Sequence, residues 1–184
     1  MKQRAFFFAP GRCFGCGGCI AACAAANGTG AAVLWRDLLK LPPAEGDHRT
    51  LYLSLACNHC VTAPCVTACP SGALIKRKKD GVVIHRESLC LGCRYCQMAC
   101  PYDAIRWDEQ QRVVSKCNFC YQRLDRGGEP ACVETCFGGA LSQKILDTDR
   151  EDHAKEAPGF THLEEARPAI RFLPPGPEGG AADG

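Results

Sequence analysis

The sequence contains no long apolar run and little excess of charge of either sign. No stretch approaches the ~20 apolar residues that a membrane-spanning helix needs, and the apolar run at residues 6–9 is too short for the hydrophobic region of a signal peptide. The formal net charge is only +2, and the one basic run, residues 76–79, gives no nucleic-acid signal. We therefore expect a chain that neither anchors nor exports itself and that does not bind nucleic acid.

What the sequence has in excess is cysteine, with 16 among 184 residues. This density in a short chain indicates cross-linking by disulfides or by metal. Disulfides need an oxidising compartment, so a chain without an export signal is expected to use its cysteines as metal ligands. Little apolar sequence remains once cysteine, glycine and proline are set aside, and metal–ligand bonds should supply much of the folding free energy.

The cysteines form four groups of four. In chain order these are Cys13, Cys16, Cys19 and Cys23; Cys57, Cys60, Cys65 and Cys69; Cys90, Cys93, Cys96 and Cys100; and Cys117, Cys120, Cys132 and Cys136. Groups one and three have the C-x2-C-x2-C-x3-C spacing associated with [4Fe–4S] clusters, and Pro101 follows group three. Such a loop wraps three thiolates round one cubane, and a short helix then carries the fourth cysteine away. We therefore expect Cys100 to serve a different cluster from the first three cysteines of its group.

Zinc is the main alternative metal, because C-x2-C pairs also occur in zinc ribbons. Zinc sites use two separated pairs, whereas three of these groups carry a closely spaced fourth cysteine. The spacing therefore favours iron–sulfur clusters. A structural zinc protein that only mediates interactions stays open as a less favoured hypothesis.

Groups two and three are predicted to form one compact module over residues 50–107. Their first cysteines lie 33 residues apart, which suits a two-cluster ferredoxin module. Between them, Asp80 and Gly81 are a hairpin turn signal, and residues 82–84 form a β-branched strand. A hairpin is therefore expected between the two groups.

By elimination, groups one and four should form a second module. It would consist of residues 1–30 and 108–146. Strand-like stretches at residues 4–9 and 111–115 should serve this module, and we interpret them as ordinary edge strands that close small sheets.

Two segments remain outside the predicted modules. Residues 31–49 are interpreted as a docking loop, in which residues 35–39 form either a short helix or a strand. Residues 147–184 are rich in charge, proline and glycine, which argues against a packed core and indicates an extended tail. Within this tail, Phe172 and Leu173 would either dock on a partner or be disordered.

Three stretches carry a family resemblance. They are CNHCVTAPCVTACPSGAL, CLGCRYCQMACPYDAIRW and KCNFCYQRLDRGGEPACVETC. Together they resemble the four-cluster iron–sulfur subunit of the DMSO reductase family of molybdoenzymes, and the 11-residue gap between Cys120 and Cys132 is the most specific feature. The resemblance implies an α+β fold with two pseudo-symmetric, bacterial-ferredoxin-like modules, long connecting loops and an irregular C-terminal tail.

The resemblance also implies which cysteines share a cluster. The implied ligand sets are Cys13, Cys16, Cys19 and Cys136 (the Cys13 set); Cys117, Cys120, Cys132 and Cys23 (the Cys117 set); Cys57, Cys60, Cys65 and Cys100 (the Cys57 set); and Cys90, Cys93, Cys96 and Cys69 (the Cys90 set). The Cys13 set would face a molybdenum-bearing catalytic subunit, and the Cys90 set a membrane subunit. Nitrate reductases of the family have tryptophan at the position of Cys93 and a three-iron cluster, so cysteine there implies four [4Fe–4S] clusters.

The function implied by the family is electron transfer. The chain would relay electrons between a molybdopterin-containing catalytic subunit and an integral membrane subunit that reacts with quinol or quinone in anaerobic respiration. It would be membrane-associated through these partners, at the cytoplasmic face or co-exported to the periplasmic face with a partner that carries a twin-arginine signal. A four-cluster polyferredoxin-type carrier of a hydrogenase or formate-hydrogen-lyase assembly is the alternative.

No catalytic site is predicted in the chain itself. The sequence shows neither a glycine-rich nucleotide loop nor a nucleophile–base constellation, so we do not expect an enzyme. Two side chains inside cysteine loops are of interest. Arg94 is hypothesised to raise the reduction potential of the cluster it adjoins, against the simpler interpretation of a solvated or interface arginine. His59 is interpreted chiefly as a structural hydrogen-bonding residue.

Overall fold

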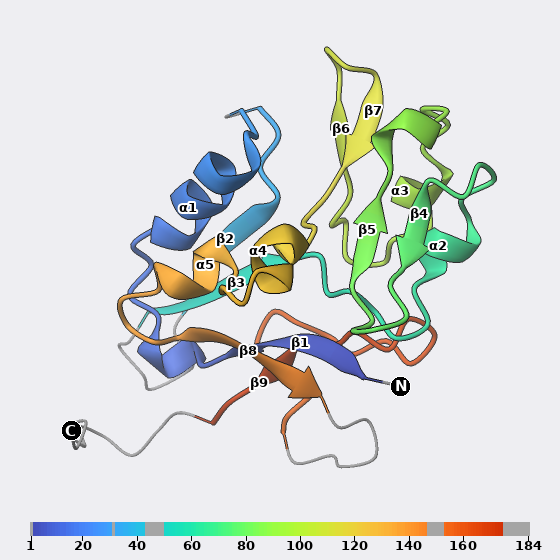
Figure 1. The fold of residues 1–184 in the computed structure, drawn as a ribbon. Helices are drawn as coiled ribbons and strands as arrows, with labels where there is room; N and C mark the ends of the chain where they lie inside the picture. Colours follow the sequence, from blue (N-terminus) through green and yellow to red (C-terminus); the bar gives the residue numbers. More distant parts are fainter. Residues whose placement is uncertain (1, 31, 43–49, 147–152, 175–184) are drawn as a thin grey trace.

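The computed structural model describes residues 2–30, 32–42, 50–146 and 153–174. Short helices and small sheets make an α+β arrangement (Figure 1). The helices are α1 (Gly18–Asn27), α2 (Pro64–Thr67), α3 (Tyr95–Met98), α4 (Tyr121–Asp125) and α5 (Ala131–Glu134), with 3-10 turns η1 (Pro10–Arg12) and η2 (Glu87–Leu89). The strands are β1 (Gln3–Phe8), β2 (Arg36–Leu41), β3 (Leu51–Ala56), β4 (Leu74–Lys76), β5 (Val83–His85), β6 (Arg106–Asp108), β7 (Val113–Ser115), β8 (Leu141–Leu146) and β9 (Arg171–Phe172). None of the helices among the described residues is long and apolar enough to cross a membrane.

The three-stranded sheet has the order β8–β1–β9, in which β8 is antiparallel and β9 parallel to β1. Side chains alternate along a strand, so Phe6 and Phe8 enter the main hydrophobic cluster and Phe7 enters a smaller cluster on the opposite face. The strand expected at residues 4–9 is therefore confirmed, but the expectation of an edge strand is wrong. β1 is central because the C-terminal segment covers its second edge.

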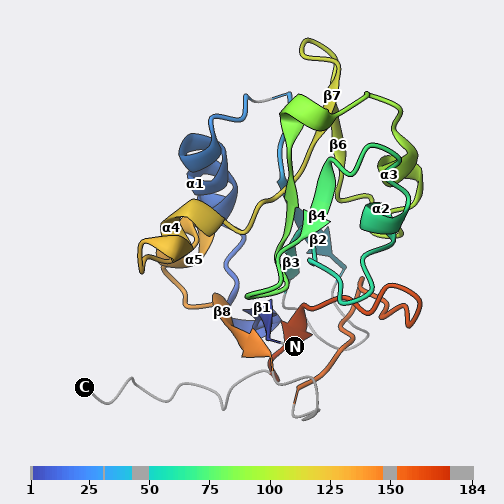
Figure 2. The same ribbon diagram turned by 45° about the vertical axis from the view of Figure 1, so that its right-hand side comes forward.

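The C-terminal segment runs beside β1 and supplies β9 (Figure 2). Phe172 is 2% exposed, and the Leu173 N–H donates to the Phe8 carbonyl at 2.8 Å. The prediction that the tail lacks a packed core is wrong for residues 153–174, because Phe172 docks on the chain's own sheet. The rest of the predicted tail lies outside the described residues.

Strands β2 and β3 form an antiparallel pair in which Arg36 lies opposite Ala56. The predicted docking loop at residues 31–49 therefore contains a strand, which decides between the helix and the strand expected at residues 35–39. α1 packs against β2, so this pair of strands lies against the first cysteine group. Residues 43–49 of the predicted loop lie outside the described residues.

The hairpin of β4 and β5 turns at Asp80 and Gly81, as expected. Gly81 has a φ of +71°, and a Cβ at this position would lie 2.3 Å from Gln3 Oε1. Glycine is therefore required both by the left-handed backbone and by the close approach of a buried side chain.

The hairpin of β6 and β7 packs with the β4–β5 hairpin and with cysteines of groups two and three. Val114 of β7 packs in a hydrophobic cluster with Leu74, Ile105 and partly buried Trp107. The prediction that residues 111–115 serve the module of groups one and four is therefore wrong, because β7 pairs with β6 across the predicted boundary.

The short helices follow the cysteine loops and pack in pairs. α1 contacts α5, and α2 contacts α3. In Figure 1, α1, α4 and α5 gather on one side, whereas α2, α3 and the β4–β5 and β6–β7 hairpins gather on the other. The main hydrophobic cluster joins the two sides, because its buried residues and the partly buried ones packed against them include cysteines of all four groups.

Candidate metal centres

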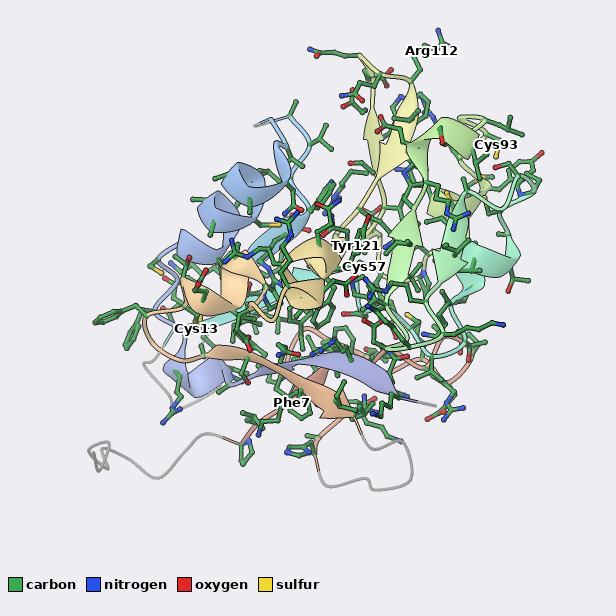
Figure 3. The ribbon with its side chains drawn as sticks, in the orientation of Figure 1. Phe7, Cys13, Cys57, Cys93, Arg112 and Tyr121 are labelled. Carbon is green, nitrogen blue, oxygen red and sulfur yellow. The ribbon has the colours of Figure 1, made fainter. Side chains whose placement is uncertain are left out.

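All sixteen cysteines lie within the described residues, and each is a free thiol. Cys13 and Cys93 lie toward opposite ends of the molecule, with Cys57 between them (Figure 3). In the part of the chain that the structure describes, no group of three or more His, Cys, Asp or Glu side chains has the spacing that would hold a single metal ion. Each thiol lies close enough to other cysteines to influence their ionisation, both within the four sets described below and between neighbouring sets.

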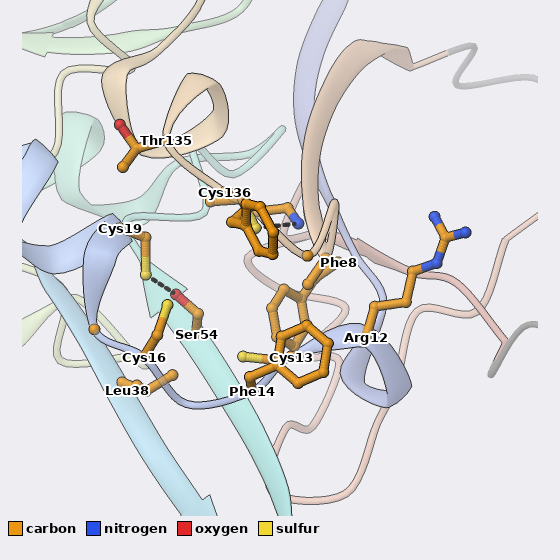
Figure 4. Close-up of a pocket in the computed structure, with 15 residues that line it drawn as sticks. Phe8, Arg12, Cys13, Phe14, Cys16, Cys19, Leu38, Ser54, Thr135 and Cys136 are labelled. Carbon is orange, nitrogen blue, oxygen red and sulfur yellow. Dashed lines mark hydrogen bonds between the residues drawn. The ribbon is translucent and has the colours of Figure 1, made fainter. Parts of the chain in front are cut away.

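At one end, Cys13 lies beside three thiols in a common pocket, those of Cys16, Cys19 and Cys136 (Figure 4). Burial raises the pKa of the Cys13 thiol, and the charges of the three neighbours raise it further. The Cys19 sulfur lies at hydrogen-bond distance, 3.3 Å, from Ser54 Oγ. Group one thus meets the last cysteine of group four here.

A second set gathers Cys23 from α1 with Cys117, Cys120 and Cys132 of group four. Burial raises the pKa of Cys23 to about 11 and that of Cys117 well above its ordinary value. In both thiols the charge of Arg36 opposes this effect. The fourth cysteine of group one therefore lies with the first three of group four.

The third set gathers Cys57, Cys60 and Cys65 with Cys100 of group three. Burial raises the pKa of Cys65 to about 12, and it also raises the pKa of Cys60. Such thiols are neutral at pH 7 without metal, so iron would bind with release of their protons.

The fourth set gathers Cys90, Cys93 and Cys96 with Cys69 of group two. Burial raises the pKa of Cys96 to about 11. The pKa of Cys69 is lowered, because hydrogen bonds, chiefly from the Leu74 backbone N–H, outweigh the opposing effect of burial. The fourth cysteines of groups two and three are thus exchanged between the two sets.

One backbone feature recurs in all four groups. The residue just before the second cysteine has a positive φ in each of them: Gly15, His59, Gly92 and Phe119. Left-handed residues in such loops turn successive N–H groups toward one side and form concavities of the kind found at Fe–S sites. Glycine adopts this conformation without strain, whereas histidine and phenylalanine do not.

The two residues other than glycine are held by packing between segments far apart in the sequence. The His59 and Phe119 rings meet edge to face at 5.1 Å, and Phe6 stacks on Phe119 at 4.1 Å. His59 Nδ1 accepts from the Val83 N–H at 3.0 Å, and burial lowers the pKa of His59 well below its ordinary value. This agrees with the structural interpretation of His59. Sequence reasoning missed the packing with Phe119, because the contacts join distant segments.

Backbone N–H groups also donate to cysteine sulfurs in groups three and four. The Leu141 N–H lies 3.3 Å from Cys136 Sγ, and the Ala104 N–H lies 3.5 Å from Cys100 Sγ. Hydrogen bonds to the sulfurs favour the thiolate and help to set the potential of a bound cluster.

Two buried cations were not expected from the sequence. Lys116 donates its Nζ to the carbonyls of Val83 and Cys117. Arg36 is 1% exposed, and its Nε and Nη2 atoms are buried with no hydrogen-bond acceptor among the described residues. Unpaired cationic donors beside buried thiols fit a group that adds negative charge and sulfur acceptors, as an iron–sulfur cluster does.

Arg94 lies in a different environment. Its side chain is 46% exposed and stacks over Trp107, with the guanidinium carbon 3.8 Å from the ring centroid. It also forms a 3.8 Å ion pair with the exposed Glu109. Its proposed effect on a cluster potential stays a prediction.

The cysteine sets and the surrounding fold are those of an iron–sulfur protein, and comparison with known proteins supports this class. The 4Fe–4S dicluster domain family matches residues 48–145. A polypeptide of the anaerobic dimethyl sulfoxide reductase of Haemophilus influenzae is 37% identical over 167 residues, which cover 85% of this chain and 81% of that one. Its counterpart in the Escherichia coli K12 enzyme is 40% identical over 162 residues, covering 82% and 78% of the two chains.

A polypeptide of the tetrathionate reductase of Salmonella typhimurium is similar too, with 37% identity over 167 residues, covering 89% of this chain and 64% of that one. The chain therefore belongs to the 4Fe–4S dicluster family and, within it, to the iron–sulfur electron-transfer subunits of DMSO reductase-type molybdoenzymes.

Proposed function

We propose that the chain holds four [4Fe–4S] clusters, one in each of the Cys13, Cys117, Cys57 and Cys90 sets. The observation that carries this proposal is that the four thiols of the Cys13 set line one pocket and those of the Cys90 set line another. The proximity of the thiols within the Cys117 and Cys57 sets supports it. Bound clusters would supply one-electron chemistry with little change of geometry. The chain's own residues supply the thiolates, the N–H donors to sulfur and the buried cations.

The sets fall into two ferredoxin-like modules related by pseudo-symmetry. The pairing of α1 with α5 and of α2 with α3 supports this division. The exchange of the fourth cysteine between partner groups, which two-cluster ferredoxins use, supports it as well. The β6–β7 hairpin belongs with groups two and three, so the proposed boundary moves from residue 107 to about residue 115.

The two outer sets are the proposed entry and exit points for electrons. Exposed apolar side chains surround both. Phe137, which follows Cys136, is 98% exposed at one end, and Leu91, between Cys90 and Cys93, is 72% exposed at the other. Apolar side chains of this kind suit docking to partner subunits. By analogy with the family, a molybdopterin-containing catalytic subunit would dock at the first end and an integral membrane subunit at the second.

The proposed task is electron relay between these two subunits in a respiratory reductase, with the chain membrane-associated through its partners. The relatives are named as parts of dimethyl sulfoxide and tetrathionate reductases. Those names do not favour the alternative of a hydrogenase or formate-hydrogen-lyase carrier. A direct test is to purify the tagged chain anaerobically from its host in mild detergent. About sixteen irons per chain, with molybdenum and a large subunit in equal amount, would support the proposal, and zinc in place of iron would overturn it.

The exchange of fourth cysteines has a sharper test. Cys100→Ser should abolish the same electron paramagnetic resonance signal as Cys60→Ser and reduce the iron content to about twelve per chain. Its mirror variant, Cys69→Ser, should instead abolish the signal lost in Cys93→Ser. If Cys100→Ser and Cys93→Ser removed the same signal, the proposed sets would be wrong.

A further inference from the structure

Arg36 is the most deeply buried charged side chain whose role the electron-transfer assignment leaves open. It lies at the start of β2, is 1% exposed, and has its guanidinium carbon 4.9 Å from the centroid of the Phe6 ring. An isolated buried charge costs several kcal/mol, so its position requires compensation. Among the described residues, its Nη1 donates to the carbonyl and hydroxyl oxygens of Ser54, and the guanidinium is also near enough to Cys132 to donate to its thiol.

The surroundings of Arg36 bring together two ligand sets. Cys132, Cys117 and Cys23 lie close enough to act on the guanidinium once they are ionised, and all three belong to the Cys117 set. Cys19, from the Cys13 set, does so as well. A hydrogen-bonded link also joins Arg36 to Cys19, because Ser54 Oγ lies 3.1 Å from Nη1 and 3.3 Å from the Cys19 sulfur.

We propose that Arg36 tunes the electron-transfer clusters. Its buried guanidinium lies between the clusters of the Cys13 and Cys117 sets and raises the reduction potential of both. Each reduction adds one electron and one negative charge to a cluster. A fixed cation stabilises that added charge, and in a buried site the effect is weakly screened. Nε and Nη2 can in addition donate to cluster or cysteine sulfurs. Arg36 itself exchanges neither electron nor proton, because arginine stays protonated.

The position between two clusters has a consequence for the relay. Two neighbouring clusters that both carry added electrons repel each other, and the attraction of each to a shared cation offsets that repulsion. Arg36 therefore favours reduction of the Cys13-set and Cys117-set clusters over reduction of the Cys57-set and Cys90-set clusters. This inference rests on the proposed ligand sets.

The test is a set of variants in the intact complex, with the potentials of all four clusters measured by redox titration monitored by paramagnetic resonance. The signals are assigned with two further variants: Cys16→Ser removes the cluster of the Cys13 set, and Cys120→Ser removes that of the Cys117 set. In Arg36→Gln, the ratio of reduced to oxidised cluster in those two sets should fall about tenfold at a fixed solution potential, equivalent to about 59 mV. Arg36→Lys, which keeps the charge but loses the planar fork of donors, should give a smaller fall.

Two further variants separate a local effect from a general one. Lys40→Gln removes a cation from the exposed end of the same strand and should leave every potential unchanged. Ser54→Ala keeps Arg36 but breaks its link to Cys19, and it should lower the potential of the Cys13-set cluster more than that of the other three. Iron content, measured in parallel, shows whether each variant has assembled its clusters.

A full iron content in Arg36→Gln with all four potentials unchanged would overturn the inference. If Arg36→Gln fails to assemble, unchanged potentials in both Arg36→Lys and Ser54→Ala would overturn it equally. Failure of the proposed function would be seen differently, as an unmodified chain that lacks iron or its paramagnetic signals.

Discussion

Phe119 connects the packing of the fold to the geometry of a cysteine loop, and truncating it gives a quantitative test. The side chain is 1% exposed, stacks on Phe6 at 4.1 Å and meets His59 at 5.1 Å. A buried aromatic side chain removes roughly 150–250 Å² from water, which at about 25 cal/mol per Å² corresponds to roughly 4–6 kcal/mol. Phe119→Ala keeps the Cβ, so we expect a loss of about 4 kcal/mol.

The backbone gives the same site a second, opposing effect. Phe119 has a φ of 58°, a conformation that costs a residue other than glycine about 1 kcal/mol or more. Phe119→Gly loses the same packing but relieves this strain, as Gly15 and Gly92 do at the equivalent positions of groups one and three. We therefore expect Phe119→Gly to be less destabilising than Phe119→Ala by about 1 kcal/mol.

The assay is loss of the visible absorbance of the clusters during anaerobic titration with guanidinium chloride. Midpoints are compared directly, because unfolding coupled to cofactor loss is not two-state. With a slope of about 4 kcal/mol per M, Phe119→Ala should lower the midpoint by about 1 M. Phe14→Ala, at a side chain 72% exposed in the first cysteine loop, is the matched control and should leave it unchanged. An alanine variant more stable than the glycine variant would refute the reasoning about the left-handed loop.

Two further perturbations test contacts that join distant segments. The indole Nε1–H of Trp35 donates to Ser115 Oγ at 2.7 Å, so Trp35→Phe should reduce the stability by about 1 kcal/mol in the same guanidinium assay. Ser115→Ala is the control. The double variant should lose no more stability than either single variant, because both remove the same hydrogen bond. Burial lowers the pKa of His162 although Glu164 lies 3.3 Å away. The folded state therefore binds fewer protons, and the packing of residues 153–174 should weaken progressively as the pH falls below 6.5, the ordinary pKa of histidine. Limited proteolysis measures this, and a profile unchanged by His162→Gln would contradict it.

The parts of the site that the sequence predicts are those encoded locally. The C-x2-C spacing determines a loop, and the x3 spacing determines a helical turn that carries the fourth cysteine away. The helices then pack as the pairing of the groups predicts, α1 on α5 and α2 on α3. The turn at Asp80 and Gly81 is equally local, because two residues suffice to specify it.

The parts that the sequence does not predict depend on contacts between distant segments. Composition alone predicts no packed core for residues 153–174, because it takes no account of the surface on which they pack. A sequence signal for this packing is nevertheless present near the N-terminus. The consecutive phenylalanines at residues 6–8 break the alternation of a strand with one wet face and indicate a strand buried on both faces. Such a strand needs a cover, and the C-terminal segment provides it.

The charges buried in the core follow from the same dependence on distant contacts. Arg36 is placed by the β2–β3 pairing, and Lys116 by a carbonyl 33 residues away, so neither is evident from its neighbours in the sequence. Arg36 lies next to the thiols of Cys132 and Cys117, and Lys116 next to that of Cys65. Burial raises the pKa of Cys117 well above its ordinary value. Without clusters, the core would hold these two cations beside neutral thiols at pH 7. With clusters, the thiolates supply negative charge. Folding of this core should therefore be coupled to cluster insertion, because the same event that adds the metal bonds also neutralises the buried cations.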